Sequence, residues 1–132
     1  IPKMNIGNSK SYDSMNELLE DSDYVTIHVP LLPETENLID ENELKLMKEG
    51  SYLLNLSRGK VVNLEAVHFS LKSGKLGGLA VDVYPNEPKK NISKWDNVLQ
   101  GSHNTILTPH IGGSTEEAQY SIGRDVANKI IR

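Results

Sequence analysis

The sequence predicts an α/β protein in which helices flank a mainly parallel sheet, and three observations support this class. Four short segments carry Val, Ile or Leu on successive residues, which is typical of strands that are covered on both faces. Amphipathic patterns with helix-start and helix-stop residues lie between them. Strand and helix patterns therefore alternate along the chain, the order that builds a parallel sheet.

The predicted strands are short and differ little in character. They are "DYVTIHV" (23–29), "SYLLNL" (51–56), "LGGLAVDV" (76–83) and "NTILTP" (104–109). Because apolar residues are consecutive in each, we expect both faces of the sheet to be covered.

The first two helices are predicted from their capping residues. Ser14 is followed three positions later by Glu17, the spacing of a capping box, so a helix is expected after Ser14. Asp40 and Glu43 repeat this spacing, and the helix that they begin is expected to end at Gly50.

The last two helices are predicted in the same way. Asn63 caps a helix that ends at Gly74, and a final helix begins at Ser114 with Glu117 three residues on. This final helix carries an apolar stripe at four-residue spacing. The stripe consists of Ala118, Ile122, Val126 and Ile130.

Composition excludes several classes of protein. The 132 residues suffice for one domain, and 37% apolar with 24% charged residues is ordinary for a globular protein. The net charge of −4 argues against a nucleic-acid surface, and the lack of cysteine excludes disulfides and thiolate metal sites. We find no apolar run of about 20 residues and no signal peptide, and we expect a cytoplasmic protein without a metal. Position 1 is not methionine, so the chain is expected to begin within a longer protein.

Polar side chains gather where the predicted strands end. They are His28, Asn55, Ser57, Arg58, Asp82, Glu87 and His110. The loops 30–37 and 84–97 follow the first and third strands directly. Because ligands of open parallel sheets bind beyond the carboxyl ends of the strands, we expect these side chains to form a site there.

Three of these residues suit acid–base chemistry on a carboxylic acid. His110 could carry a proton near neutral pH, and a carboxylate such as Glu87 could fix its tautomer. Arg58 could grip a substrate carboxylate through two parallel hydrogen bonds. This set suits removal of a hydroxyl proton while a hydride leaves the same carbon.

Each candidate also has an ordinary structural explanation. Arg58 could be a solvated charge after a strand, and Glu87 an ordinary loop residue. Asp82 could cap a turn, and His28 could be a histidine whose ring is satisfied at a strand end. The glycines after His110 allow a close approach of the backbone to another group, which favours function at that position.

The motifs resemble those of the D-isomer-specific 2-hydroxyacid dehydrogenases from about Ser22 to Ile131. The matching stretches are "SDYVTIHVPLLPETENLID", "LMKEGSYLLNLSRGKVVN", "GGLAVDVYPNEP" and "NTILTPHIGGSTEEAQ". Their order and spacing match too, with Glu87 29 residues after Arg58 and His110 23 residues after Glu87. The resemblance implies that Arg58 binds the carboxylate and carbonyl of the substrate. It also implies that Glu87 orients His110, which acts as the general acid and base.

The resemblance further implies NAD as cofactor and a Rossmann-like parallel sheet with flanking helices. Asp82 and the backbone at Leu56 and Ser57 would hold the nicotinamide carboxamide. The remaining cofactor contacts would be His28, Val29 and Pro30 near the adenosine, and Gly112 and Gly113 beside the nicotinamide or substrate. The family often has a small residue where this chain has Leu56.

One element of a dinucleotide site is missing from the sequence. No G-x-G-x-x-G occurs, and the glycines of "SGKLGG" (73–78) precede a strand rather than follow one. We therefore interpret residues 1–110 as the second half of an NAD-binding domain. Residues 111–132 would be a helix leading back toward a substrate domain. Such a half sheet is expected to leave a strand edge and apolar faces uncovered, to bind NAD weakly and to turn over poorly.

The resemblance implies an NAD-dependent oxidoreductase that interconverts a small D-2-hydroxy acid and its 2-keto acid. The parent enzyme would be a homodimer or homotetramer, with no nucleic-acid or membrane partner. Two alternatives remain. Some relatives act as cofactor-sensing corepressors with the same three residues, and the chain could also be a truncated product with a structural role only.

Overall fold

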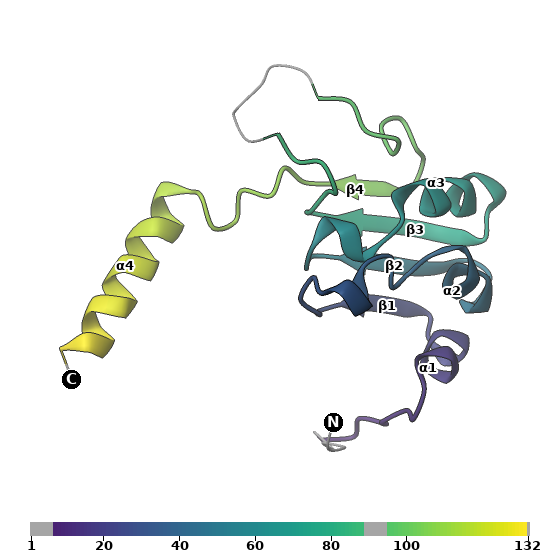
Figure 1. Ribbon diagram of the computed structural model, residues 1–132, viewed down its shortest axis with the longest axis horizontal. Coiled ribbons are helices and arrows are strands. Elements are labelled where there is room, and N and C mark those ends of the chain that lie inside the picture. The colour runs from purple at the N-terminus through teal and green to yellow at the C-terminus, as the bar shows by residue number, and fades with distance from the viewer. Residues whose placement is uncertain (1–6, 89–94, 132) are drawn as a thin grey trace.

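A computed structural model of the chain describes residues 7–88 and 95–131. Its centre is a parallel sheet of four strands, placed side by side in chain order (Figure 1). The strands are β1 (Tyr24–Ile27), β2 (Ser51–Asn55), β3 (Leu76–Val81) and β4 (Thr105–Leu107). All four predicted strands and the α/β class are therefore confirmed, and each strand is shorter than its apolar run.

Three helices cover one face of this sheet. They are α1 (Met15–Asp21), α2 (Glu41–Leu46) and α3 (Leu64–Ser73), and α2 contacts both of its neighbours. Each crossover moves the chain one strand further in the same direction, and crossovers of one hand then place every helix on the same face. The buried core lies between these helices and the sheet, with Leu19, Leu44, Leu53 and Val67 almost fully enclosed.

The opposite face of the sheet is open, so the expectation that both faces are covered is wrong for this part of the chain. Burial alternates along β1 and β2, and Tyr24, Tyr52 and Ile106 are 69%, 41% and 67% exposed. The two tyrosine rings stack on each other, with centroids 4.9 Å apart. An uncovered apolar face is what half of a dinucleotide-binding sheet was expected to show.

The capping residues act as predicted at three helix starts and one helix end. Ser14 accepts a hydrogen bond from the Glu17 amide, and Asp40 forms a complete capping box with Glu43. The Asn63 side chain accepts from two amides of α3, which ends at Gly74 in the left-handed conformation. Local side-chain chemistry therefore sets these helix boundaries.

Two predicted helix boundaries are wrong. Helix α2 ends at Leu46, and Gly50, with φ of 73°, instead forms the turn that leads into β2. Helix α4 (Glu116–Ile130) is capped by Thr115, whose side chain accepts from the Ala118 amide. Ser114 lies one residue earlier, in a turn that its amide closes onto the carbonyl of Ile111.

Helix α4 stands away from the sheet at the end of an extended segment (Figure 1). Its predicted apolar stripe is solvent-exposed, with Ile122, Val126 and Ile130 all at least half exposed. Two single-turn 3₁₀ helices, η1 (Pro33–Thr35) and η2 (Gly59–Val61), follow β1 and β2.

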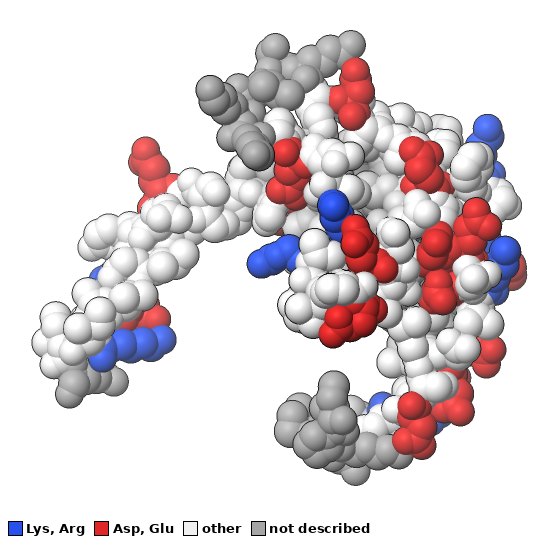
Figure 2. Space-filling model, viewed as in Figure 1, with Lys and Arg blue, Asp and Glu red and all other residues white. Residues whose placement is uncertain are grey.

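The charged side chains of the described residues agree with the net charge of −4. Acidic side chains predominate on the face drawn in Figure 2, and Lys and Arg stand singly there. The described part of this face therefore offers no continuous basic surface for a phosphate backbone. None of the helices within 7–88 and 95–131 is both long and apolar enough to cross a bilayer.

Candidate active site

Three chain segments meet beyond the carboxyl ends of β2, β3 and β4. Arg58 follows β2, Glu87 follows β3 and His110 follows β4, and all three line one pocket of about 290 Å³. The other lining residues are Leu31, Gly59, Lys60, Val83, Tyr84 and Pro85. The sheet therefore brings together the three side chains that the sequence singled out. In the sequence they are up to 52 residues apart, the separation of Arg58 and His110.

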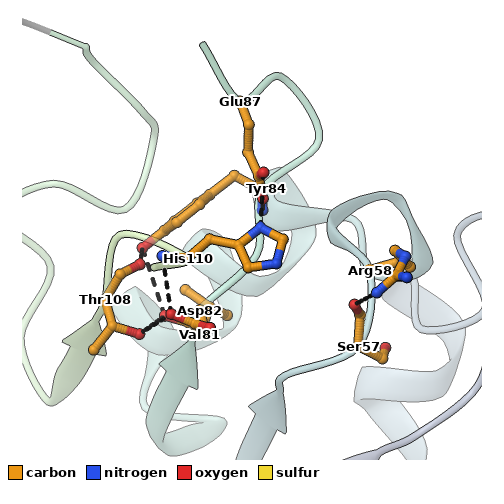
Figure 3. A network of polar contacts seen from close by, with 8 residues as sticks. All are labelled: Ser57, Arg58, Val81, Asp82, Tyr84, Glu87, Thr108 and His110. Carbon is orange, nitrogen blue, oxygen red and sulfur yellow. Dashed lines mark hydrogen bonds and ion pairs between the residues drawn. The ribbon is translucent and has the colours of Figure 1, made fainter. Parts of the chain in front are cut away.

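His110 and Glu87 form a directly bonded pair. The Nδ1 atom of His110 lies 2.8 Å from Oε2 of Glu87, and both side chains are partly exposed to solvent. An ionised carboxylate only accepts hydrogen bonds, so Nδ1 carries the proton. The opposite nitrogen, Nε2, lies on the side of the ring toward Arg58 (Figure 3). The pair thus presents one ring nitrogen to the pocket for proton transfer.

The backbone at His110 has an unusual conformation that Asp82 supports. His110 has φ of 54°, in the left-handed region that residues other than glycine rarely adopt. Its amide donates to Oδ1 of Asp82 at 3.0 Å, and the Thr108 hydroxyl donates to the same oxygen. Asp82 follows β3 directly, so the neighbouring strand fixes the direction in which the imidazole points.

Arg58 sits on a turn that Asn55 holds. Asn55 is fully buried at the end of β2, where its amide donates to the Arg58 carbonyl and its oxygen accepts from the Ser57 amide. The Arg58 guanidinium is exposed and donates to the Ser57 carbonyl at 2.7 Å. Among the described residues no carboxylate pairs with it, which leaves this cation for an anionic ligand.

Tyr84 is a site residue that the sequence did not single out. Its hydroxyl donates to the Thr108 carbonyl at 2.9 Å, and its amide donates to Oε1 of Glu87 at 2.8 Å. The side chain is 7% exposed. Burial, and then the negative charges of Asp82 and Glu87, raise the pKa of the Tyr84 hydroxyl above its usual value. A single aromatic residue after a strand is typical of a core, so the sequence held no signal for this role.

The raised pKa of Tyr84 predicts a loss of stability at alkaline pH. The folded state holds this proton more tightly than the unfolded state. The resulting contribution to the free energy of unfolding is complete below about pH 10 and disappears as pH rises through the folded pKa. Tyr84→Phe should remove this part of the pH dependence, whereas Tyr120→Phe, on an exposed side chain, should not. The free energy of unfolding from urea titrations between pH 8 and 12 measures the difference. Equal slopes for wild type and Tyr84→Phe in that range would contradict the prediction.

The residues expected to contact NAD are spread along the same edge of the sheet. Asp82 uses only Oδ1 in its bonds to the described residues, so Oδ2 can accept from an amide. Leu56 is 53% exposed, and Ser57 bonds to Asn55 through its hydroxyl. The remaining candidates are exposed apart from the half-buried Val29; these are His28, Pro30, Gly112 and Gly113. His28 Nε2 lies 2.9 Å from the Thr26 hydroxyl and does not line the pocket around His110.

These donors and acceptors fit the nicotinamide end of the cofactor but not its pyrophosphate. The pyrophosphate needs a glycine turn after a strand. Here Gly77 and Gly78 lie inside β3, where an added Cβ would come within 2.3 Å of the Gly50 carbonyl oxygen and 2.9 Å of the Tyr52 ring. Those glycines therefore serve strand packing. Among the described residues, no group of three or more His, Asp or Glu side chains is arranged to hold a metal ion.

Comparisons with known proteins show the family of the chain. Residues 3–112 match the family model "D-isomer specific 2-hydroxyacid dehydrogenase, NAD binding domain". The chain is 55% identical over 130 residues to D-3-phosphoglycerate dehydrogenase of Dictyostelium discoideum and 45% identical over 130 residues to that of Escherichia coli K12. Each of these two alignments covers 98% of this chain and 32% of the relative.

A solved structure shows the same fold. The NAD-dependent formate dehydrogenase of Staphylococcus aureus, in complex with NAD, superposes with a TM-score of 0.75 and 40% identity. That match covers 90% of this chain and 35% of the other. The chain thus spans about a third of the length of the relatives that it matches. It belongs to the D-isomer specific 2-hydroxyacid dehydrogenase family, and residues 3–112 match that family's NAD-binding domain.

Proposed function

We propose that this chain supplies the acid–base half of an NAD-dependent oxidoreductase that interconverts a D-2-hydroxy acid and its 2-keto acid. The proposed pair is 3-phosphoglycerate and 3-phosphohydroxypyruvate. The observation that carries the proposal is the single pocket lined by Arg58, Glu87 and His110, with His110 bonded to Glu87. The names of the two curated relatives support the choice of substrate.

His110 is the proposed proton donor and acceptor. In reduction, Nε2 gives its proton to the keto oxygen as that oxygen gains charge, and in oxidation Nε2 takes the hydroxyl proton. Glu87 keeps a proton on Nδ1 throughout and stabilises the imidazolium that forms during oxidation. Bound NAD supplies the hydride acceptor, or the donor in the reduced form, at the same carbon.

Arg58 is the proposed anchor for the substrate carboxylate. Its planar guanidinium can bind two carboxylate oxygens at once, which fixes the orientation of the carbon that reacts. Asn55 makes this possible by holding the turn on which Arg58 stands.

The proposed cofactor contacts follow the same edge of the sheet. Asp82 and the backbone at Leu56 and Ser57 would hold the nicotinamide amide. The other contacts would come from His28, Val29 and Pro30 toward the adenosine, and from Gly112 and Gly113 beside the nicotinamide. We assign residues 1–110 to the NAD-binding domain and 111–132 to a helix that leads toward the substrate domain. A cytoplasmic homodimer or homotetramer is the proposed state of the whole enzyme, in keeping with a chain that lacks cysteine.

A chimera tests the function directly. The 130-residue segment would replace its counterpart in the Dictyostelium discoideum relative. Oxidation of NADH would then be followed with 3-phosphohydroxypyruvate, hydroxypyruvate and glyoxylate. We expect 3-phosphohydroxypyruvate to give the highest kcat/KM. A folded chimera that binds NADH but turns over none of the three acids would refute the oxidoreductase proposal, and preference for another acid would refute the substrate.

Arg58→Ala in this chimera should lower kcat/KM for the keto acid by about 10²–10³-fold, because a buried substrate carboxylate loses its charged partner. NADH affinity, measured by fluorescence titration, should stay the same. Lys45→Ala is the matched control, because Lys45 is an exposed cation that pairs only loosely with Glu41 at 3.8 Å. Equal loss in both variants would show that Arg58 has no specific contact with substrate.

A further inference from the structure

Tyr84 contacts the elements that carry all three proposed site residues. Its amide bonds to Glu87, and its hydroxyl bonds to the Thr108 carbonyl, two residues before His110. Its carbonyl group lies against Gly59, next to Arg58, where a Cβ built on the glycine would come within 2.0 Å of the Tyr84 carbonyl carbon. One buried residue therefore touches the segments after β2, β3 and β4.

These contacts form a closed ring around the His110–Glu87 pair (Figure 3). Glu87 uses Oε1 to accept from the Tyr84 amide and Oε2 to bond His110. From His110 the chain runs back through Pro109 to Thr108, whose carbonyl accepts the Tyr84 hydroxyl. Among the described residues, this hydroxyl makes the only hydrogen bond between Tyr84 and the segment after β4.

The Tyr84 ring is firmly placed. It packs edge-on against Trp95, with centroids 4.7 Å apart and planes at 82°, and it belongs to the hydrophobic core. A buried phenol needs a partner for its hydroxyl. The Thr108 carbonyl at 2.9 Å is the nearer of its two acceptors, and the Val81 carbonyl lies at 3.5 Å. The ring therefore acts as a spacer of fixed length between the core and the segment that carries His110.

We propose that Tyr84 is a positioning residue: its hydroxyl holds the segment after β4 at the place where His110 Nδ1 meets the Glu87 carboxylate. Phenylalanine would fill the same space and keep the core, but it would release the Thr108 carbonyl. The segment with the left-handed backbone at His110 would then be held by Asp82 and by the bond from the Thr108 amide to the Val81 carbonyl. The consequence for catalysis rests on the proposed function, whereas the effect on the His110–Glu87 bond does not.

The test measures the imidazole tautomer of His110 by long-range ¹H–¹⁵N NMR on the 132-residue chain, without cofactor or substrate. In wild type we expect the proton mainly on Nδ1, where Glu87 accepts it. In Tyr84→Phe we expect a shift toward the tautomer that free histidine prefers, with the proton on Nε2. Glu87→Gln should show the same shift, and Tyr120→Phe, on exposed α4, should show none. An unchanged tautomer in folded Tyr84→Phe overturns the proposal.

A titration of wild type gives a second test that needs no variant. A Tyr84 phenolate cannot donate to the Thr108 carbonyl, so the His110 tautomer should shift as Tyr84 loses its proton at alkaline pH. Carbon-13 at the ζ position of tyrosine reports that titration, and His110 is observed in the same samples. If the tautomer stays constant while Tyr84 titrates in the folded chain, the proposal fails even where Tyr84→Phe does not fold. Neither readout needs turnover. Both can therefore fail while the chimera remains active, and both can succeed while the chimera is inactive.

Discussion

Replacement of His110 by Gln is expected to lower kcat of the chimeric dehydrogenase by about 10²–10⁴-fold, the range that a positioned general acid–base contributes. Glutamine keeps a polar side chain of similar reach but cannot carry a proton to the substrate. The loss should be in kcat and kcat/KM together, because proton transfer occurs only in the transition state. Stopped-flow oxidation of NADH by 3-phosphohydroxypyruvate measures it.

Two controls make this result specific. His103→Gln changes an exposed histidine in the loop before β4, at the other end of that strand, and should leave turnover unchanged. NADH binding to His110→Gln should equal that of wild type, which separates loss of chemistry from loss of the cofactor site. If His110→Gln retains more than about a tenth of wild-type kcat, proton transfer by His110 is excluded as the main contribution.

The sequence predicted the sheet well because parallel strands and capped helices leave local signals. "SYLLNL" and "LGGLAVDV" became β2 and β3, and the caps at Asp40 and Asn63 act as their side chains suggest. What it could not predict is which face of the sheet is covered. Consecutive apolar residues such as Leu53 and Leu54 are typical of strands that are covered on both faces. They do not tell which segments of the chain provide that cover. Within residues 7–88 and 95–131, only the face toward α1–α3 has such a cover.

The sequence could indicate the polar side chains at the strand ends, but not every residue of the candidate site. Arg58, Glu87 and His110 stand out because polar residues interrupt strand ends, and topology then brings them to one pocket. Tyr84 and Thr108 left no such signal, because a buried phenol and a threonine carbonyl resemble ordinary core and loop. Helix boundaries failed for a related reason. Ser114 and Thr115 are adjacent and both suit an N-cap, so the side-chain types alone do not decide which of them caps α4.

The pocket depends on close contact between the turn after β2 and the loop after β3, and this contact requires Gly59. Gly59→Ala is expected to destabilise the chain by about 3 kcal/mol, at the upper end of the range for overpacking. The added Cβ would lie 2.0 Å from the Tyr84 carbonyl carbon, 2.2 Å from its oxygen and 2.5 Å from the Pro85 nitrogen. All three are backbone atoms, so no side-chain rotation can relieve the clash. Urea denaturation of the 132-residue chain measures the change in free energy of unfolding.

Gly112→Ala is the matched control for Gly59→Ala. A Cβ at Gly112 would meet no atom within 4 Å, and its φ is not in the left-handed region. This variant should be as stable as wild type or more stable by up to about 1 kcal/mol, because alanine restricts the unfolded chain. A loss at Gly59 no larger than the change at Gly112 would mean that the two loops separate easily. If the loss is large, relief can come only from a shift of the Tyr84 backbone away from the turn that carries Arg58. Because the Tyr84 amide bonds to Glu87, the same substitution should then disturb the His110 tautomer, which links packing at Gly59 to the geometry of the proton donor.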